Sequence, residues 1–475
     1  MHSHSGPSIN RRALLIGGTA LAASASLVRA GRAAPAEPNV VELTAAAGRV
    51  PIVGAPYPRT DVWCYGDRVP GPEIRVRQGE RVRVIVRNDL PEETTVHWHG
   101  IRVPNSMDGV PGLTQPPIKP GESFTYEFTP PDAGTFWYHP HSDSLRQLGR
   151  GMAGAFIVEE PTAVSVDRDL VWMLSDWRLT SEAQIAAGFG NAMEAAMSGR
   201  VGNTVTLNGA VPDEVPMRAG ERIRLRLVNT SLARIMSLRF EGHRPVIVAI
   251  DGQPCDPHEP ERGRILLGPA MRVDLVIDMQ GEPGRRYRVI DDFYEGLSYW
   301  LAKFVYEDKP PLRAHHLEPS PSLPRNPLPE PDLAAAERHE LRLQGGMMGG
   351  GMMGMGGMQG MSHGASWAIN GTSMTGDGHA NMPPLLTLRL GRSYVLTIRN
   401  ETAWWHPMHL HGYSFRVLTR NGTAVPHRRW ADTVLVPPRD TVEVAFVADN
   451  PGDWMMHCHV TNHQVSGMMT VLRVA

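Results

Sequence analysis

The sequence contains few cysteines and no strong imbalance of charge. Three of its 475 residues are cysteine, which excludes a fold held together by a network of disulfides. The 47 lysines and arginines nearly match the 49 aspartates and glutamates, so the chain lacks the basic surplus typical of nucleic-acid binders. Beyond residues 1–36, no apolar run approaches the roughly 18 residues of a membrane-spanning helix. We expect no nucleic-acid partner and no stable membrane anchor.

Glycine, proline, histidine and methionine are, by contrast, abundant. The 48 glycines and 41 prolines disfavour long helices and favour short strands joined by turns. The 20 histidines and 24 methionines supply imidazole and thioether groups, both of which ligate copper.

Residues 1–36 have the features of an export signal. Arg11 and Arg12 precede a mildly apolar stretch from Ala13 to Val28, and an A-x-A cleavage site ends at Ala36. This pattern resembles a twin-arginine signal peptide. It predicts export by the twin-arginine machinery, cleavage after Ala36 and a periplasmic location; the alternatives are a membrane anchor or a disordered tail.

One sequence pattern occurs three times. A glycine stands nine residues before an asparagine in 79–88, 220–229 and 391–400, and apolar and polar residues mostly alternate between them. This period of two predicts a half-buried antiparallel strand after a turn. The glycines lie 141 and 171 residues apart, so the repeating unit is a domain.

The repeats predict an all-β protein of three consecutive β-sandwich domains. We expect the domains at 37–165, 166–307 and 336–475, with a proline-rich linker at 308–335.

Four His-x-His pairs stand at equivalent positions of the first and third repeats. They are His97 and His99, His139 and His141, His409 and His411, and His457 and His459. The positions in the second domain that match the first pair hold Leu238 and Phe240. Residues i and i+2 of a strand share a face, so each pair presents two imidazoles together. Four pairs in register predict a multinuclear metal centre, whereas one pair alone would be compatible with an exposed strand.

The last pair encloses a further set of candidate ligands. Cys458 lies between its two histidines, His463 and Met468 follow five and ten residues later, and His406 precedes the other pair of the third domain. Two histidines, a cysteine and a weak axial methionine form the ligand set of a blue-copper site; the alternative for Met468 is a core position. Because Cys458 points to the opposite strand face from its neighbours, one strand can serve two metal sites.

These motifs resemble those of the multicopper oxidases, which include laccases, bilirubin oxidase-like enzymes and bacterial copper-resistance oxidases. The resemblance implies three cupredoxin-like Greek-key β-sandwiches and four copper ions: one type 1, one type 2 and two type 3. It implies one-electron oxidation of a reductant at type 1, and four-electron reduction of O2 to water at a trinuclear cluster. The alternatives are a non-enzymatic copper-binding protein and a nitrite reductase.

The resemblance also implies a role for each ligand. The type 1 copper would be held by His406, Cys458, His463 and Met468, and the type 2 copper by His97 and His409. One type 3 copper would be held by His99, His139 and His459, and the other by His141, His411 and His457. Asp108 matches the family's acidic residue near the cluster and would supply protons; the alternative is a turn aspartate. Several bacterial members have a glutamate after the last type 1 histidine, where this chain has Gln464.

Residues 345–361 are rich in methionine and resemble the insertion of periplasmic cuprous oxidases. The candidate ligands for substrate copper are Met347, Met348, Met352, Met353, Met355, Met358 and Met361, whose thioethers favour Cu(I). We favour Cu(I) as the reductant, in copper tolerance. Thr402 and Trp404 stand where the cuprous oxidases have an aspartate and a methionine. The alternatives are a low-complexity loop without a ligand role, and a laccase that oxidises phenols or aromatic amines near Trp404 and Trp405.

Two further predictions concern the remaining cysteines and the oligomeric state. Cys64 and Cys255 either form a disulfide between the first two domains or are separate apolar residues. We expect the protein to be a monomer.

Overall fold

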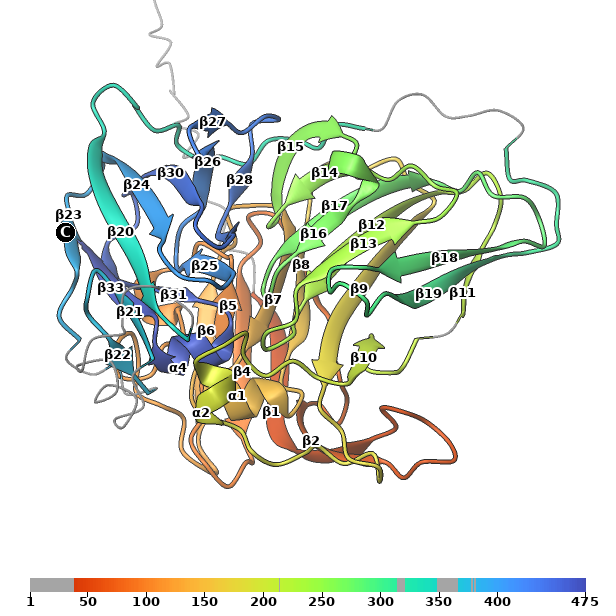
Figure 1. Cartoon of the computed structure of the whole chain (residues 1–475), viewed down its shortest axis with the longest axis horizontal. Helices are drawn as coiled ribbons and strands as arrows, with labels where there is room; N and C mark the ends of the chain where they lie inside the picture. Colours follow the sequence, from red (N-terminus) through yellow and green to blue (C-terminus); the bar gives the residue numbers. More distant parts are fainter. Residues whose placement is uncertain (1–37, 213, 314–320, 348–365, 377–378, 380–381) are drawn as a thin grey trace, which may run out of the picture. The chain divides into compact units, whose positions relative to one another are not determined.

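The computed structural model describes residues 38–212, 214–313, 321–347, 366–376, 379 and 382–475. Residues 38–475 form one compact unit. The expected export signal and most of the methionine-rich segment lie outside the described residues. Figure 1 follows the chain from the orange strands near residue 50 to the blue strands near the C-terminus.

The first sandwich is built from residues 39–159. One sheet has the strand order β2-β1-β4-β6 and the other β3-β8-β7-β5. The strands are β1 (Asn39–Val50), β2 (Thr60–Tyr65), β3 (Ile74–Arg77), β4 (Val82–Asn88), β5 (His97–His99), β6 (Ser123–Phe128), β7 (Gly134–His139) and β8 (Gly154–Glu159). Trp98, Tyr126 and Phe156 fill the core between the sheets.

The second sandwich is built from residues 168–306. Its sheets have the orders β10-β9-β12-β17-β14-β15 and β11-β19-β18-β13-β16. The strands are β9 (Arg168–Trp177), β10 (Thr204–Leu207), β11 (Glu214–Met217), β12 (Arg222–Asn229), β13 (Met236–Phe240), β14 (Val246–Ile250), β15 (Gln253–His258), β16 (Ile265–Leu267), β17 (Arg272–Asp278), β18 (Arg286–Asp291) and β19 (Tyr299–Tyr306).

The third sandwich is built from residues 337–474. Its sheets have the orders β21-β20-β24-β30-β26-β27, with β28 paired to β26, and β23-β33-β31-β25-β29; β22 pairs with β32. The strands are β20 (Glu337–Gly345), β21 (Trp367–Ile369), β22 (Met374–Thr375), β23 (Leu386–Leu388), β24 (Ser393–Asn400), β25 (His406–Leu410), β26 (Phe415–Arg420), β27 (Thr423–Ala424), β28 (Trp430–Ala431), β29 (Thr433–Val436), β30 (Thr441–Val447), β31 (Gly452–Cys458), β32 (Ser466–Gly467) and β33 (Met469–Val474).

The repeated sequence pattern forms the same strand in all three sandwiches. Strands β4, β12 and β24 each pair in parallel with the first strand of their sandwich, which is β1, β9 or β20. Each also pairs in antiparallel with a later strand, which is β6, β17 or β30. The asparagine that ends each strand, such as Asn88, is buried and donates its side-chain amide to backbone carbonyls. The all-β fold of three consecutive β-sandwiches predicted from the repeats is confirmed, as is the cupredoxin-like fold that the family resemblance implies.

Helical segments are short. They are η1 (Asn105–Met107), α1 (Ser144–Gly149), α2 (Ala192–Ala195), η2 (Glu261–Gly263) and α4 (Thr461–Val465). No helix within the described ranges has the length and apolar character needed to cross a bilayer.

Cys64 and Cys255 are not joined. Both are free and buried. Cys64 packs with Ile52 and Val62 beside the first sandwich, whereas Cys255 belongs to the core of the second. The disulfide alternative is therefore wrong, and both thiols act as small apolar side chains.

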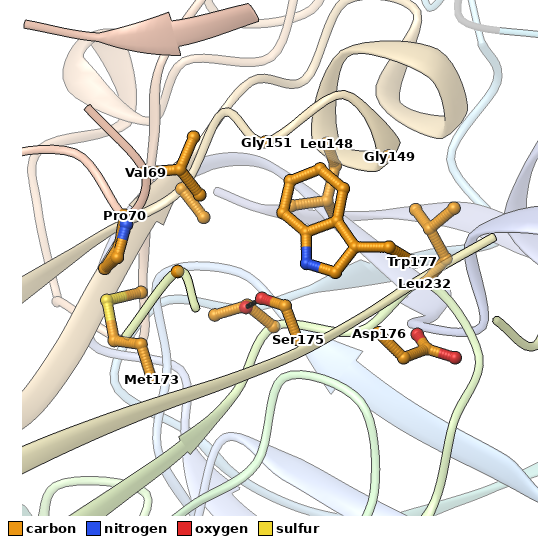
Figure 2. Close-up of a pocket in the computed structure, with 13 residues that line it drawn as sticks. Val69, Pro70, Leu148, Gly149, Gly151, Met173, Ser175, Asp176, Trp177 and Leu232 are labelled. Atoms are coloured by element: carbon orange, nitrogen blue, oxygen red, sulfur yellow. Dashed lines mark hydrogen bonds between the residues drawn. The ribbon is translucent and has the colours of Figure 1, made fainter. Parts of the chain in front are cut away.

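The first two sandwiches enclose a small cavity where they meet (Figure 2). Its volume is about 20 Å³, and its lining includes Pro70, Leu148 and Trp177. That space is enough for about one water molecule, so this contact between sandwiches is closely packed.

Candidate metal centre

Three predicted ligands meet at one end of the third sandwich. His406 begins β25, Cys458 ends the neighbouring strand β31, and His463 lies in α4. The Cys458 Sγ atom is 3.5 Å from His406 Nδ1 and 3.6 Å from His463 Nδ1, and the two nitrogens are 3.2 Å apart. A point equidistant from the three atoms lies about 2 Å from each, which matches metal–imidazole bonds of ~2.0–2.1 Å.

The outer nitrogens of both histidines are already hydrogen-bonded. His406 Nε2 is 2.8 Å from the Thr402 hydroxyl oxygen, and His463 Nε2 donates to the Met197 carbonyl at 2.7 Å. These bonds fix each ring with Nδ1 turned toward Cys458. Burial lowers the pKa of His463 to about 3 and raises the pKa of the Cys458 thiol. The imidazoles are therefore neutral ligands, and the thiol needs a metal to become a thiolate.

Met468 is tied to this site through its backbone. Its carbonyl accepts from the Cys458 amide at 3.0 Å, and its amide donates to the His463 carbonyl at 2.9 Å. Its side chain is fully buried in the core of the third sandwich. These two hydrogen bonds hold the backbone of the fourth predicted ligand against Cys458 and His463.

The eight histidines of the four pairs gather between the first and third sandwiches. None is more than 3% exposed. Strand pairing sets His97 opposite His139 on β5 and β7, and His409 opposite His457 on β25 and β31. Across the two sandwiches, the rings of His97 and His411 stack at 3.9 Å and those of His99 and His409 at 3.8 Å.

Potential ligand atoms of these histidines form several compact groups. Within each group the atoms lie no more than 4.8 Å apart: His97, His99 and His139; His97, His409 and His411; and His141, His411 and His457. His459 has its ring 5.0 Å from that of His99 and 5.2 Å from that of His139. The third group has the same members as one predicted type 3 site.

Many ring nitrogens in this cluster have no hydrogen-bond partner within the described part of the chain. They are Nε2 of His97, His139 and His409, Nδ1 of His99, and both ring nitrogens of His141 and His459. Buried polar atoms are normally hydrogen-bonded, so this concentration indicates positions that bind something else. Burial lowers the pKa of His99, His141 and His459, which leaves neutral imidazoles. The donor set therefore fits copper.

Comparison with known proteins agrees with this geometry. Family models described as multicopper oxidase match residues 48–163, 168–297 and 356–475. The chain belongs to the multicopper oxidase family.

Its relatives cover nearly the whole chain. The multicopper oxidase MmcO of Mycobacterium tuberculosis is 29% identical over 96% of this chain and 91% of its own length. The copper resistance protein A of Escherichia coli is 25% identical over 86% and 88%. The structure of a multicopper oxidase from Pseudomonas thermotolerans superimposes with a TM-score of 0.80 at 34% identity, covering 92% of this chain and all of that one.

As a multicopper oxidase, the chain uses four copper ions, with which the family couples one-electron oxidation of a reductant to the reduction of O2. The polypeptide supplies the link between the two metal centres. Cys458 is the last residue of β31, with His457 before it and His459 after it. Successive side chains of a strand point to opposite faces, so the Cys458 side chain points away from both histidines. The group of His406, Cys458 and His463 is thus joined to the histidine cluster through the two chain neighbours of Cys458.

Two buried aspartates each join histidines of different sandwiches. Asp108 Oδ2 accepts from His411 Nδ1 at 2.9 Å, while its Oδ1 lies 3.3 Å from His97 Nδ1. Asp432 Oδ1 lies 3.1 Å from His99 Nε2 and 3.3 Å from His409 Nδ1. The backbone carbonyls of the same residues accept from His97 Nδ1 at 2.8 Å and from His409 Nδ1 at 2.9 Å. Each aspartate therefore orients one ring through its carboxylate and a ring of the other sandwich through its backbone carbonyl.

Asp108 was a candidate from the sequence, but Asp432 was not. Asp108 stands 11 positions after His97, whereas Asp432 stands 23 positions after His409. Asp432 makes in the third sandwich the contacts that Asp108 makes in the first, but the unequal spacing hides this match in the sequence. Its role arises from β29, which pairs with β25 and carries Thr433 next to it.

The second sandwich supports this site from outside. Arg272 Nη1 donates to Asp432 Oδ1 at 2.8 Å. Asp251 accepts from the Arg272 amide at 2.9 Å and from the Thr433 amide at 3.0 Å. All of these side chains are buried. Residues of the second sandwich thus hold the aspartate that contacts His99 and His409.

The remaining candidates differ in their placement. Met347 is described, whereas Met348, Met352, Met353, Met355, Met358 and Met361 lie outside the described residues. Gln464 is buried in α4, and its side-chain Nε2 has no partner among the described residues. His379, which the sequence did not identify as a ligand, is fully buried, and burial lowers its pKa to about 4.

Proposed function

We propose that the copper ligands are those implied by the sequence motifs. His406, Cys458, His463 and Met468 hold type 1 copper; His97 and His409 hold type 2; His99, His139, His459 and His141, His411, His457 hold the two type 3 ions. Two compact groups of ligand atoms support this assignment: His406, Cys458 and His463 for type 1, and His141, His411 and His457 for one type 3 ion. So do the unpartnered ring nitrogens, because each of the three cluster positions includes at least one.

We further propose that the reductant is Cu(I). The observation that carries this proposal is the position of Met347. Its amide donates to the Ala196 carbonyl at 2.8 Å, and its carbonyl accepts from Trp404 Nε1 at 2.8 Å. Ala196 precedes Met197, whose carbonyl binds His463, and Trp404 lies two residues before His406. The methionine-rich segment therefore begins beside the type 1 ligands.

The residues that follow the segment return to the same place. The Gly346 amide donates to the Ser366 carbonyl at 2.9 Å. The ring of Trp367 lies 4.2 Å from that of His463 and 5.0 Å from that of His406. Both described flanks of the segment thus lie beside the proposed type 1 ligands, and thioethers are the side chains that favour Cu(I).

The surroundings of His463 support a small reductant. The ring is fully buried, and its Nε2 is covered by the Met197 backbone. A bulky phenol could not contact this ring edge without displacing α2 and Trp367. The hydroxyl of Thr402 orients His406, so this departure from the cuprous oxidases has a structural role of its own.

A laccase acting on phenols or aromatic amines is the second candidate. Trp404 and Trp405 are half-buried next to His406, and the Trp405 ring lies 5.6 Å from that of Phe293. This aromatic surface could hold a planar reductant.

We also propose that the protein acts in copper tolerance in the periplasm. The twin-arginine pattern of residues 1–36 favours export as a folded protein, and the likeness to copper resistance protein A favours a role in copper tolerance.

Substitution of methionine by leucine removes the thioether and keeps a similar apolar volume, so it distinguishes Cu(I) from a phenol as the reductant. A variant with Met348, Met352, Met353, Met355, Met358 and Met361 all changed to Leu should lose most Cu(I) turnover and keep phenol oxidation. Met193→Leu, at a methionine 57% exposed outside the segment, is the control and should change neither. O2 uptake on Cu(I) and on a dimethoxyphenol measures both. Unchanged Cu(I) kinetics would favour the laccase, as would unchanged kinetics after deletion of residues 345–361.

A further inference from the structure

A cavity of about 640 Å³ leads from the surface of the first sandwich toward the histidine cluster. Its outer lining includes the exposed residues Pro91, Glu93 and Pro120, and its inner lining includes the buried residues Ser142 and His379. Ser142 is the chain neighbour of His141, a candidate ligand of the cluster. The cavity therefore ends one residue from the copper ligands.

His379 lies at this inner end without a partner. It is fully buried, and neither of its ring nitrogens has a hydrogen-bond partner among the described residues. Its ring meets that of His141 edge-on, with centroids 5.6 Å apart. The Ser142 hydroxyl beside it is likewise unpartnered. A buried imidazole with both nitrogens free, between a cavity and a metal ligand, has the chemistry of an additional ligand.

The charges along the cavity favour a cation. Glu92, Glu93 and Asp143 line it together with one cationic residue, Arg146. Arg146 is paired with Glu92 and Asp143, whereas Glu93 has no ion-pair partner in the described part of the chain. Clefts with an excess of one charge concentrate ions of the opposite charge.

Soft side chains lie behind the histidine. The Met382 amide donates to the His379 carbonyl at 3.4 Å. Met382 packs with Met374, Met455 and Met469 around Val110. Thioethers in this position suit Cu(I) rather than a hard cation.

We propose that this cavity admits copper to the trinuclear site during assembly of the enzyme, and that His379 binds the incoming Cu(I) and transfers it to His141. The ion changes ligands without changing oxidation state. The proposal rests on the proposed ligand assignment, in which His141 belongs to the cluster. The lining of the cavity does not include His406, Cys458 or His463, so the proposed route does not serve the type 1 site.

The rate of copper loading tests this route. Copper-free protein is mixed anaerobically with Cu(I) in a weakly binding complex, and samples are desalted over time and oxidised in air. Copper per chain is measured, together with the blue absorption of type 1 and the magnetic resonance signal of type 2. His379→Ala should slow filling of the cluster roughly tenfold and leave the rate at which the blue colour appears unchanged. His243→Ala, at a histidine of the second sandwich bonded to Tyr306, is the control.

A second variant tests the charge of the cavity without touching its buried end. Glu93→Lys should slow cluster filling roughly tenfold at low ionic strength, and the difference should shrink as salt is added. Glu42→Lys makes the same charge change at an exposed position of β1 that does not line the cavity, and should have no effect.

Three outcomes would overturn the proposal. Equal loading rates in all variants would mean that copper enters elsewhere. Equal slowing of type 1 and the cluster would mean a general effect on folding. Normal copper loading of the His379→Ala and Glu93→Lys variants, together with a raised KM for O2, would mean that the cavity admits dioxygen and not copper. If the unaltered protein binds four coppers but His141→Ala keeps the intact cluster signals, the ligand assignment itself has failed.

Discussion

The Oδ2 atom of Asp108 lies 2.9 Å from Nδ1 of His411, 303 positions further along the chain. The carboxylate is 1% exposed and also lies 3.3 Å from His97 Nδ1. The Asp108 backbone carbonyl accepts from the same His97 nitrogen at 2.8 Å. One residue thus orients a ring from the third sandwich through its carboxylate and a ring from the first through its backbone. The histidine cluster depends on how the two sandwiches dock as well as on the strands that carry the histidines.

Asp108→Asn should impair the cluster and spare type 1. The neutral amide weakens the hydrogen bond that the carboxylate accepts from His411 and removes the negative charge 3.3 Å from His97 Nδ1. We therefore expect O2 reduction to fall by roughly 10- to 100-fold, as for other residues that orient metal ligands. The blue absorption and copper content should be retained. Full activity on the same reductant would show that the carboxylate neither orients the rings nor supplies protons.

Arg272→Met should destabilise the fold. The guanidinium is fully buried between Asp432 and Asp251, and its removal leaves buried carboxylates without their cation, at a cost of about 3–5 kcal/mol. Chemical denaturation of the copper-free protein measures the change.

Arg288→Met is the matched control for that substitution. Arg288 is 58% exposed and pairs with Glu241 at the surface, so its loss should cost less than about 1 kcal/mol. Similar destabilisation by both substitutions would mean that the buried network does not hold the second sandwich to the third.

The sequence predicted the histidine pairs but not their supports, for a physical reason. His-x-His spacing on a strand and the repeated offset from asparagine are local patterns, and they placed His97, His99, His409 and His411 correctly on β5 and at β25. Asp432, Arg272 and His379 act through contacts between sandwiches. Such contacts depend on tertiary packing, which leaves no periodic signal in the sequence.

Removal of copper should lower the melting temperature. Without metal, the cluster retains buried ring nitrogens that have no hydrogen-bond partner in the part of the chain that the structure describes, and such groups cost stability. Binding to the folded state alone adds about 2.7 kcal/mol when free copper is 100 times its Kd. Calorimetry of the copper-free and reloaded protein tests this; equal melting temperatures would contradict a preformed site.

Substitution of single ligands should separate the two centres. Cys458→Ser removes the thiolate and should abolish both the blue colour and oxidase activity. His97→Ala should keep the colour and stop O2 reduction, because its ring contacts only the cluster. A colourless His97→Ala protein that retains its other coppers would contradict the assignment.

The number of electrons that one chain stores tests the account most directly. The type 1 copper is linked through Cys458 to the three coppers of the cluster. Together the four ions should accept four electrons from an anaerobic titrant, with the blue colour lost during the titration. One O2 per chain should then restore the colour without forming hydrogen peroxide. Uptake of a single electron, or reoxidation that releases hydrogen peroxide, would contradict a type 1 site coupled to a trinuclear cluster.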